Sequence, residues 1–277
     1  MKIGIAGLGL IGGSMAKAFK FHTENEVYGC DTDEASFKRA VLVGAVDGRL
    51  DESTIPDCDV IIVALYPKAA VEYICSNAQF IKKGAVVVDC CGVKQYVCAP
   101  CFEVAKKHGF EFYGGHPMAG TQFSGFAAAR ENLFNGASMI IVPEDTDDIF
   151  KLDYVKSIFT SVGFKNITIT DAATHDRMIA YTSQLAHVVS NAYVKSPNAQ
   201  VHKGFSAGSF KDLTRVARLN ETMWTELFLE NADFLAEEID RIADELKKYS
   251  HAIKSRDAET LCALLKEGSI AKENSEK

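Results

Sequence analysis

Short apolar runs alternate with amphipathic segments through the first 170 residues of the chain. Five runs have strand length and are rich in β-branched residues, namely residues 3–6, 26–30, 60–64, 85–89 and 138–142. Most are apolar at every position, which is typical of strands covered on both faces. Between them the pattern predicts helices around residues 12–22, 33–43, 68–79, 94–107 and 147–162. Repeated strand–helix units of this kind predict an α/β fold with a doubly wound, mostly parallel sheet.

After Thr170 the strand pattern stops, and residues 172–195 and 222–253 are predicted as helices. We therefore expect two domains, residues 1–170 and an all-helical part, residues 171–277. The second helix carries an apolar stripe at alternating spacings of four and three: Leu235, Ile239, Ile242, Leu246, Tyr249 and Ile253. Such a stripe either packs within the chain or forms a seam between two subunits. Residues after Gly268 are polar, so we expect a frayed end.

Composition narrows the class of partner. The 277 residues include 30 basic and 37 acidic side chains, and the net charge of -7 without a run of Lys or Arg argues against nucleic acid and anionic membranes as partners. No stretch approaches the length of a membrane span, and the amino terminus lacks the layout of a signal peptide. Eight cysteines in such a chain are typical of cytosolic thiols. We expect a cytoplasmic protein that acts on small molecules.

Two of these cysteines, Cys98 and Cys101, have the spacing of a thiol redox site or half of a zinc site. A second pair at zinc-finger distance is missing from the sequence, and the segment reads as the start of a helix. We therefore expect neither a metal nor a disulfide there.

A glycine-rich loop follows the first predicted strand and opens the first predicted helix. The spacing Gly7-x-Gly9-x-x-Gly12 allows a tight turn, close approach of the backbone to a pyrophosphate, and packing of the helix on its strand. Asp31 ends the second strand, where an acid bonds ribose hydroxyls and repels a 2′-phosphate, so NAD is favoured over NADP. The predicted cofactor-binding residues here are Gly7, Leu8, Gly9, Leu10, Ile11, Gly12 and Asp31.

A histidine lies between glycines after the strand predicted at residues 111–113. Residues 114–120 read Gly-Gly-His-Pro-Met-Ala-Gly, at the end of the strand where open α/β sheets bind ligands. His116, followed by Pro117, could act there as an acid, a base or a hydrogen-bond partner. The alternative is a histidine that caps a turn, but glycines that permit close approach favour a ligand.

The helical part offers further polar candidates. His187 lies on a mostly apolar helix, where an ordinary interpretation is a core histidine whose hydrogen bonds are satisfied. Lys211 and Arg215 are four residues apart, which by itself is also typical of a solvated helix face.

Taken together, these motifs resemble the prephenate/arogenate dehydrogenase family of tyrosine biosynthesis. The matching segments, in chain order, are residues 7–14, 89–94, 114–120, 183–187, 208–215 and 223–224. The likeness is colinear over roughly residues 1–250, and its His-Pro and Phe-Lys-Asp-x-Thr-Arg segments are more specific than the glycine loop. It implies a Rossmann-type NAD-binding domain followed by a helical domain that forms a homodimer.

The resemblance also implies an activity, the oxidative decarboxylation of prephenate to 4-hydroxyphenylpyruvate with NAD as oxidant. In such a reaction His116 would accept a hydrogen bond from the hydroxyl on ring carbon 4, and Arg215 would pair with the ring carboxylate through its two-pronged guanidinium. The resemblance assigns substrate binding to His187, Lys211, Thr121 and Trp224, the last of these either from the same chain or from the other subunit.

Two positions depart from the family pattern. Gly92 stands where many relatives have a serine, so a hydroxyl donor beside the histidine and the nicotinamide is either missing or replaced by a backbone amide or Cys91. The resemblance still assigns Gly92 to the cofactor site. Gln122 stands where some relatives have an acid that could pair with the arginine, which leaves Arg215 more available to substrate.

Three alternatives to prephenate dehydrogenase remain at this point. Arogenate dehydrogenase differs only in a substrate side chain that ends in an amino acid, and it forms tyrosine directly. A β-hydroxyacid dehydrogenase of similar shape is disfavoured because such enzymes use a helical-domain lysine and lack the His-Pro loop. A non-catalytic NAD(H)-responsive binding protein would not need both His116 and Arg215.

Overall fold

The computed structural model describes residues 1–121 and 123–276. In this part the strands form one sheet of eight in the order β3-β2-β1-β4-β5-β6-β7-β8. Their bounds are β1 (Lys2–Ala6), β2 (Glu26–Cys30), β3 (Gly48–Arg49), β4 (Val60–Val63), β5 (Val86–Asp89), β6 (Glu111–Met118), β7 (Ser138–Val142) and β8 (Asn166–Ile169). All neighbours are parallel except β6 and β7. The predicted mostly parallel sheet is confirmed.

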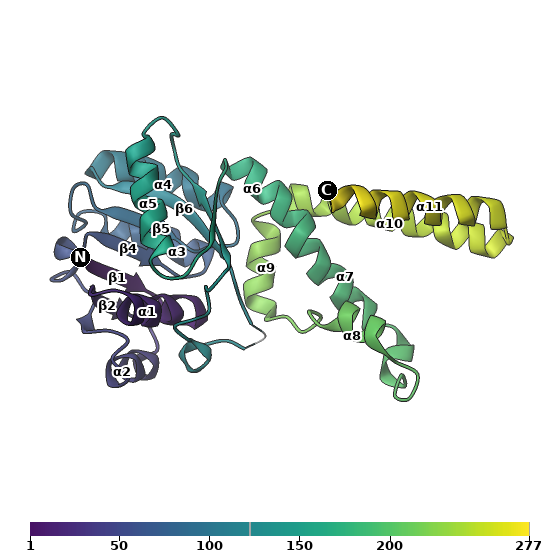
Figure 1. The fold of residues 1–277 in the computed structure, drawn as a ribbon, viewed down its shortest axis with the longest axis horizontal. Coiled ribbons are helices and arrows are strands. Elements are labelled where there is room, and N and C mark those ends of the chain that lie inside the picture. The colour runs from purple at the N-terminus through teal and green to yellow at the C-terminus, as the bar shows by residue number, and fades with distance from the viewer. Residues whose placement is uncertain (122, 277) are drawn as a thin grey trace.

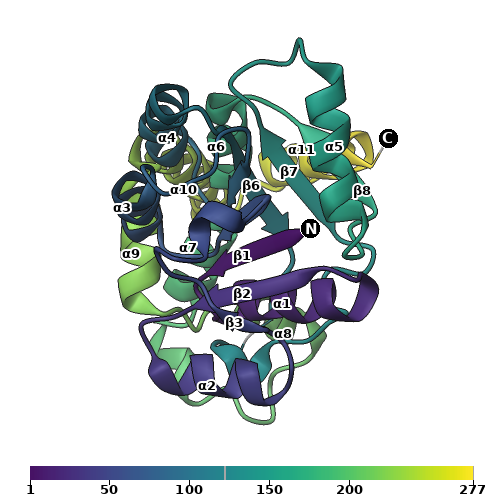
Figure 2. The ribbon, with the colours of Figure 1, turned by 90° about the vertical axis from the view of Figure 1, so that its left-hand side faces the viewer.

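Helices cover both faces of the sheet, as Figure 2 shows, so the predicted doubly wound arrangement is confirmed. The first face holds α1 (Leu10–His22), α2 (Glu34–Leu42) and α5 (Ile149–Thr160), and the second holds α3 (Pro67–Asn77) and α4 (Gln95–His108). The strands that no apolar run predicts are β3 and β8, at the two edges. An edge strand is covered less completely, and β8 has mostly exposed side chains, so neither carries a continuous apolar signal.

After β8 the described chain is helical. It contains α6 (Ala172–Ile179), a π-helical segment (Ala180–Gln184), α7 (Leu185–Tyr193), α8 (Gly208–Thr214), α9 (Glu221–Leu229), α10 (Ala232–Ser255) and α11 (Ala258–Ser275). Short 3-10 helices lie in the connections at Ile55–Asp57, Phe126–Ala128 and Pro197–Gln200. Figure 1 shows this helical part beside the α/β part, with α10 and α11 as an antiparallel pair that extends away from the sheet.

Two sequence predictions about these helices are wrong. The helix predicted over residues 222–253 is interrupted between α9 and α10, where the buried Asn231 donates hydrogen bonds to the Asp176 carbonyl at 2.9 Å and to Gln184 Oε1 at 2.7 Å. The end predicted to fray is helical to Ser275, because α11 returns along α10 and Tyr249 reaches the Leu264 carbonyl.

The apolar stripe of α10 divides into two halves. Leu235 is buried, and Ile239 and Ile242 pack against the small core that it forms with Leu185. Farther along the helix, Leu246 is 61% exposed and Ile253 is 59% exposed. Within one chain the first half of the stripe is therefore an internal contact. In the second half Tyr249 is half-buried beside α11, and Leu246 and Ile253 are exposed. Among the described residues, none of the helices is both long and apolar enough to cross a membrane.

Candidate active site

The glycine loop joins β1 to α1 through close backbone contacts. Gly7 has a φ of +88°, and a Cβ there would lie 2.5 Å from the Ala64 carbonyl oxygen. A Cβ on Gly12 would overlap the Gly7 carbonyl oxygen, so both positions require glycine for the fold itself. Gly9 is different, because nothing lies within 4 Å of the position of its Cβ, and no side chain caps the start of α1. The loop therefore offers free amides and open space, which fit a pyrophosphate.

Asp31 lies next to this loop at the end of β2. Its Oδ2 accepts a hydrogen bond from the Leu8 amide at 2.7 Å, and its Oδ1 accepts one from the Asp33 amide at 2.8 Å. Each carboxylate oxygen retains a lone pair, so Asp31 can also accept bonds from ribose hydroxyls. The Leu8 side chain is fully buried, so this residue supports the loop from the core, whereas Leu10 and Ile11 stay partly exposed in the first turn of α1.

His116 lies inside β6, opposite Ile140 of β7, and not in a turn after a strand. The strand predicted at residues 111–113 therefore continues to Met118. A Cβ on Gly114 would lie 2.5 Å from Cys98 Sγ of α4, and one on Gly115 would overlap the Asp89 carbonyl oxygen of β5. Gly114 and Gly115 are therefore required because β6 packs closely against its neighbours, whereas nothing lies within 4 Å of the position of a Cβ on Gly120.

A buried ion pair holds the residue before His116. Asp89 and Lys94 are both fully buried and bond to each other. Asp89 Oδ1 accepts the Gly115 amide at 3.0 Å, and Lys94 Nζ donates to the Gly115 carbonyl at 2.5 Å. Burial by itself lowers the pKa of Lys94, but the Asp89 carboxylate and nearby thiols more than compensate, so the pKa is raised. The pair fixes the backbone on which His116 stands.

A chain of hydrogen bonds joins the His116 ring to the helical part. His116 Nδ1 lies 2.9 Å from His175 Nε2, and His175 Nδ1 lies 2.7 Å from Asp176 Oδ1. His175 and Asp176 are buried at the start of α6. Sequence reasoning missed both residues, and the adjacent His-Asp pair near a helix start was the one signal available. Burial lowers the pKa of His116 well below 6.5, and the neighbouring His175 and Lys94 lower it further.

The other ring nitrogen of His116, Nε2, is not used within the protein. Among the residues of the described chain, none forms a hydrogen bond with Nε2. A Cβ on Gly92 would lie 3.8 Å from this nitrogen and 3.5 Å from Leu227 Cδ2 of α9. Nε2 thus has no bonding partner and lies near Gly92 and Leu227, at the carboxyl ends of β5 and β6, where open α/β sheets bind ligands. Because Gly92 is a glycine, it places no side chain beside this nitrogen.

A second cluster lies one turn earlier on α9. The rings of His187 and Trp224 are 4.0 Å apart, and His187 Nδ1 donates to the Val216 carbonyl at 3.1 Å. Burial lowers the pKa of His187, and the positive charge of Arg215 contributes in the same direction. Trp224 and Leu227 are three residues apart, a rise of about 4.5 Å along α9, and so lie near the same face of this helix. The helix thus contacts His187 through Trp224, and Leu227 lies close to Gly92 beside His116.

Three predicted site residues are not joined to these clusters by any direct bond. Lys211 in α8 and Arg215 just after it are exposed, and among the described residues their side chains form no ion pair. Thr121 follows β6, and its Oγ1 bonds to the backbone of Phe123. Gln122 lies outside the described residues.

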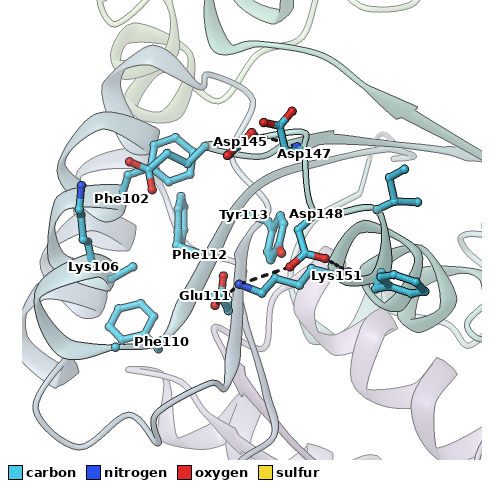
Figure 3. A pocket seen from close by; sticks show the side chains of 15 residues that line it. Phe102, Lys106, Phe110, Glu111, Phe112, Tyr113, Asp145, Asp147, Asp148 and Lys151 are labelled. Carbon is cyan, nitrogen blue, oxygen red and sulfur yellow. Dashed lines mark hydrogen bonds and ion pairs between the residues drawn. The ribbon is translucent and has the colours of Figure 1, made fainter.

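A pocket of about 790 Å³ lies elsewhere, as Figure 3 shows. It is lined by Glu111, Phe112 and Tyr113 at the amino end of β6 and by an acidic segment that includes Asp147 and Asp148. His116 lies toward the opposite end of the same strand. Because ligands of open α/β sheets bind at the carboxyl ends of the strands, this pocket is not the site of the chemistry.

Cys98 and Cys101 are buried in α4 with free thiols. Burial raises the pKa of Cys98 to about 12, so its thiol is protonated at neutral pH and is a poor nucleophile. Within residues 1–121 and 123–276, no group of three or more His, Cys, Asp or Glu side chains is arranged to hold a metal ion.

Comparison with known proteins gives consistent matches over nearly the whole chain. Residues 15–168 match the nucleotide-binding domain of prephenate dehydrogenase, and residues 171–267 match its dimerisation domain. The prephenate dehydrogenase of Lactococcus lactis subsp. cremoris is 30% identical over 275 residues, which cover 96% of this chain and 75% of that protein.

Two solved structures are similar over almost their full length. The prephenate dehydrogenase of A. aeolicus, in complex with hydroxyphenyl propionate and NAD+, has a TM-score of 0.85 and 27% identity, and the match covers 99% of this chain and 98% of that one. The arogenate dehydrogenase of Synechocystis has a TM-score of 0.82 and 25% identity, covering 99% of this chain and 100% of that one.

Proposed function

Because the chain belongs to the prephenate dehydrogenase family, we propose that it is an NAD-dependent oxidoreductase that converts prephenate to 4-hydroxyphenylpyruvate in tyrosine biosynthesis. The observation that carries the assignment is the unpartnered Nε2 of His116, which lies beside Gly92 at the carboxyl ends of β5 and β6. The open backbone at Gly9 and the carboxylate of Asp31 fit the cofactor at the same edge of the sheet.

The proposed roles follow from the chemistry of the substrate. NAD supplies the acceptor for the hydride that leaves ring carbon 4. His116 Nε2 accepts the hydrogen bond, and then the proton, of the hydroxyl on that carbon as it becomes carbonyl-like. Arg215 holds the ring carboxylate in position until carbon dioxide is lost from carbon 1. Further contacts with substrate are proposed for His187, Lys211, Thr121 and Trp224.

Arogenate is the second candidate substrate, because the chain also resembles an arogenate dehydrogenase over its full length. The test is to mix the purified protein with NAD and either prephenate or arogenate and to follow the absorbance of the reduced cofactor. We expect turnover with prephenate to exceed that with arogenate, and NAD to be used more efficiently than NADP because Asp31 repels a 2′-phosphate. Failure to reduce NAD with either substrate would refute the proposed activity.

Arg215→Ala should raise KM for the substrate, at a cost of about 2–5 kcal/mol in binding. The lost counter-charge of the ring carboxylate accounts for the effect. Loss of carbon dioxide moves the charge of the carboxylate into the ring, so strong binding of the carboxylate by Arg215 would not stabilise the transition state. The substitution should therefore change kcat less than KM. Arg218→Ala, which removes an exposed arginine three residues away, is the matched control in steady-state kinetics. An unchanged KM for Arg215→Ala would contradict the role.

We also propose a homodimer formed through the helical domain, with the domain division at residue 170 and a cytoplasmic location. Leu246 and Ile253 of the α10 stripe are exposed in one chain, and so are the proposed substrate contacts Lys211 and Arg215 in and after α8. A second copy could cover both regions. In sedimentation at micromolar concentration, the protein should have about twice the chain mass of 30.2 kDa. A monomeric protein would contradict the proposed interface between subunits along α10.

A further inference from the structure

We propose that His175 and Asp176 are positioning residues that set the tautomer of His116, so that the helical domain prepares the reactive nitrogen of the NAD-binding domain. The inference rests on the proposed function only for its kinetic consequence. The arrangement of protons is a property of the protein itself and follows from three side chains in one line.

The positions of the protons follow from Asp176, the member of the series Asp176–His175–His116 that acts as an acceptor. Both oxygens of Asp176 accept backbone amides, from Lys94 and Gln95, so this side chain acts as an acceptor toward His175 Nδ1 as well, and Nδ1, 2.7 Å away, carries a proton. Burial lowers the pKa of His175 despite this contact, so the ring is neutral and its Nε2 holds a lone pair. That lone pair faces His116 Nδ1 at 2.9 Å, so Nδ1 of His116 carries the proton. In a neutral His116 ring, Nε2 is then the bare nitrogen.

The alternative proton arrangements are disfavoured by the surroundings. A proton on His116 Nε2 would leave two lone pairs facing each other across 2.9 Å. A second proton on His175 would create a charge in a side chain that is 2% exposed, with the Lys94 ammonium nearby opposing it. Asp89 and Asp176 are the acids near these rings, and Asp89 is already paired with Lys94. The bare Nε2 is the arrangement in which every close contact pairs a donor with an acceptor.

Asp176, at the end of this series of hydrogen bonds, is held by residues from several elements. Asp176 accepts the amides of Lys94 at 2.7 Å and Gln95 at 2.8 Å at the start of α4. Its carbonyl accepts from Asn231, the residue that separates α9 from α10. Asp176 is fully buried, so its carboxylate cannot turn away without leaving amides unpaired. The ring of His175 is therefore presented to β6 in one orientation.

Because of this geometry, the bare Nε2 of His116 depends on the position of α6 relative to β6. The bond between the two histidines joins β6 to α6 and thus crosses from the sheet to the helical part. If it breaks, His116 can exchange its ring proton between the two nitrogens, and the form with a proton on Nε2 cannot accept from the substrate hydroxyl. The helical part therefore selects the competent tautomer in addition to binding substrate.

Two substitutions of His175 separate positioning from general structure. The amide of Gln reaches the place of the ring Nε2, so His175→Gln keeps an acceptor for His116. The shorter amide of Asn reaches only the place of Nδ1, so His175→Asn keeps the contact with Asp176 but loses the one with His116. Both variants keep a polar side chain, so folding should be affected similarly. We expect kcat to fall by about tenfold or more in His175→Asn, with KM within about twofold, and to recover largely in His175→Gln.

Glu226→Ala is the matched control, because it removes another hydrogen bond between the helical part and the α/β part. Glu226 Oε1 of α9 accepts the Lys68 amide of α3 at 2.8 Å, but Glu226 does not touch His116 or His175. Its loss should leave kcat within about twofold. If His175→Gln were as impaired as His175→Asn, or if Glu226→Ala lowered kcat as much as either, the positioning role would be overturned.

Nitrogen NMR of the full-length protein labelled with 15N-histidine reads the tautomer without any turnover. The His116 signals are assigned by their loss in His116→Asn. In the unmodified protein at pH 8 we expect a protonated Nδ1 and a bare Nε2, and in His175→Asn a mixture of tautomers. A proton on Nε2 in the unmodified protein, or an unchanged His116 signal in His175→Asn, would overturn the proposal. Because NMR needs no substrate, failure of the proposed activity would be seen separately.

Discussion

His116→Asn should lower kcat by on the order of a hundredfold or more while substrate binding changes less. Nε2 is unpartnered and lies beside Gly92. In the proposed reaction it is the acceptor that the substrate hydroxyl needs as its carbon is oxidised. Asparagine keeps a polar group on β6 but has no basic nitrogen to take the proton. Steady-state kinetics with NAD and prephenate measure both constants. Near-normal turnover would show that the role carried over from the family does not hold in this chain.

The low pKa of His116 gives this prediction a pH dependence. Burial, His175 and Lys94 favour the neutral ring, so its pKa lies well below 6.5. His116 can accept a proton only when neutral, and it therefore stays competent as the pH falls from 8 to 6.5. Loss of activity through this residue should begin only at more acidic pH. A decline in kcat/KM that begins above pH 6.5, and that His116→Asn removes, would contradict the environment described here.

Lys94→Met should lower the free energy of unfolding by about 3–5 kcal/mol, because it leaves the Asp89 carboxylate buried without its partner. Both side chains are fully buried, and Lys94 also holds the Gly115 carbonyl. Denaturation in urea gives the stability. The residual activity of folded protein should fall as well, since the backbone at His116 is no longer held on both sides.

An exposed lysine provides the control for this substitution. Lys151 pairs with Glu111 at 2.7 Å but is 49% exposed, so Lys151→Met should cost no more than about 1 kcal/mol. In the double variant Lys94→Met/Asp89→Asn, the neutral amide replaces the unpaired carboxylate, and part of the stability should return. If Lys94→Met were no more destabilising than Lys151→Met, the buried pair would not stabilise the fold as argued.

The α/β half of the fold was predictable because each of its signals is local. A continuous apolar run such as residues 60–64 reports burial on both faces of a strand, and this property belongs to the run itself. The glycine spacing from Gly7 to Gly12 likewise describes one turn and the start of one helix. The helices after β8 were harder to delimit, because the interruption at Asn231 depends on hydrogen bonds to distant residues.

The sequence by itself determined the alternation of strands and helices, the cofactor loop, and His116 as the residue to test. Tertiary structure alone decided what surrounds His116: its place inside β6, the Asp89–Lys94 pair behind it, and the His175–Asp176 pair beside it. His116 and His175 are 59 residues apart in the chain. Periodicity shows which face of an element is buried but not which other element covers it, so contacts between distant residues leave no local pattern to read.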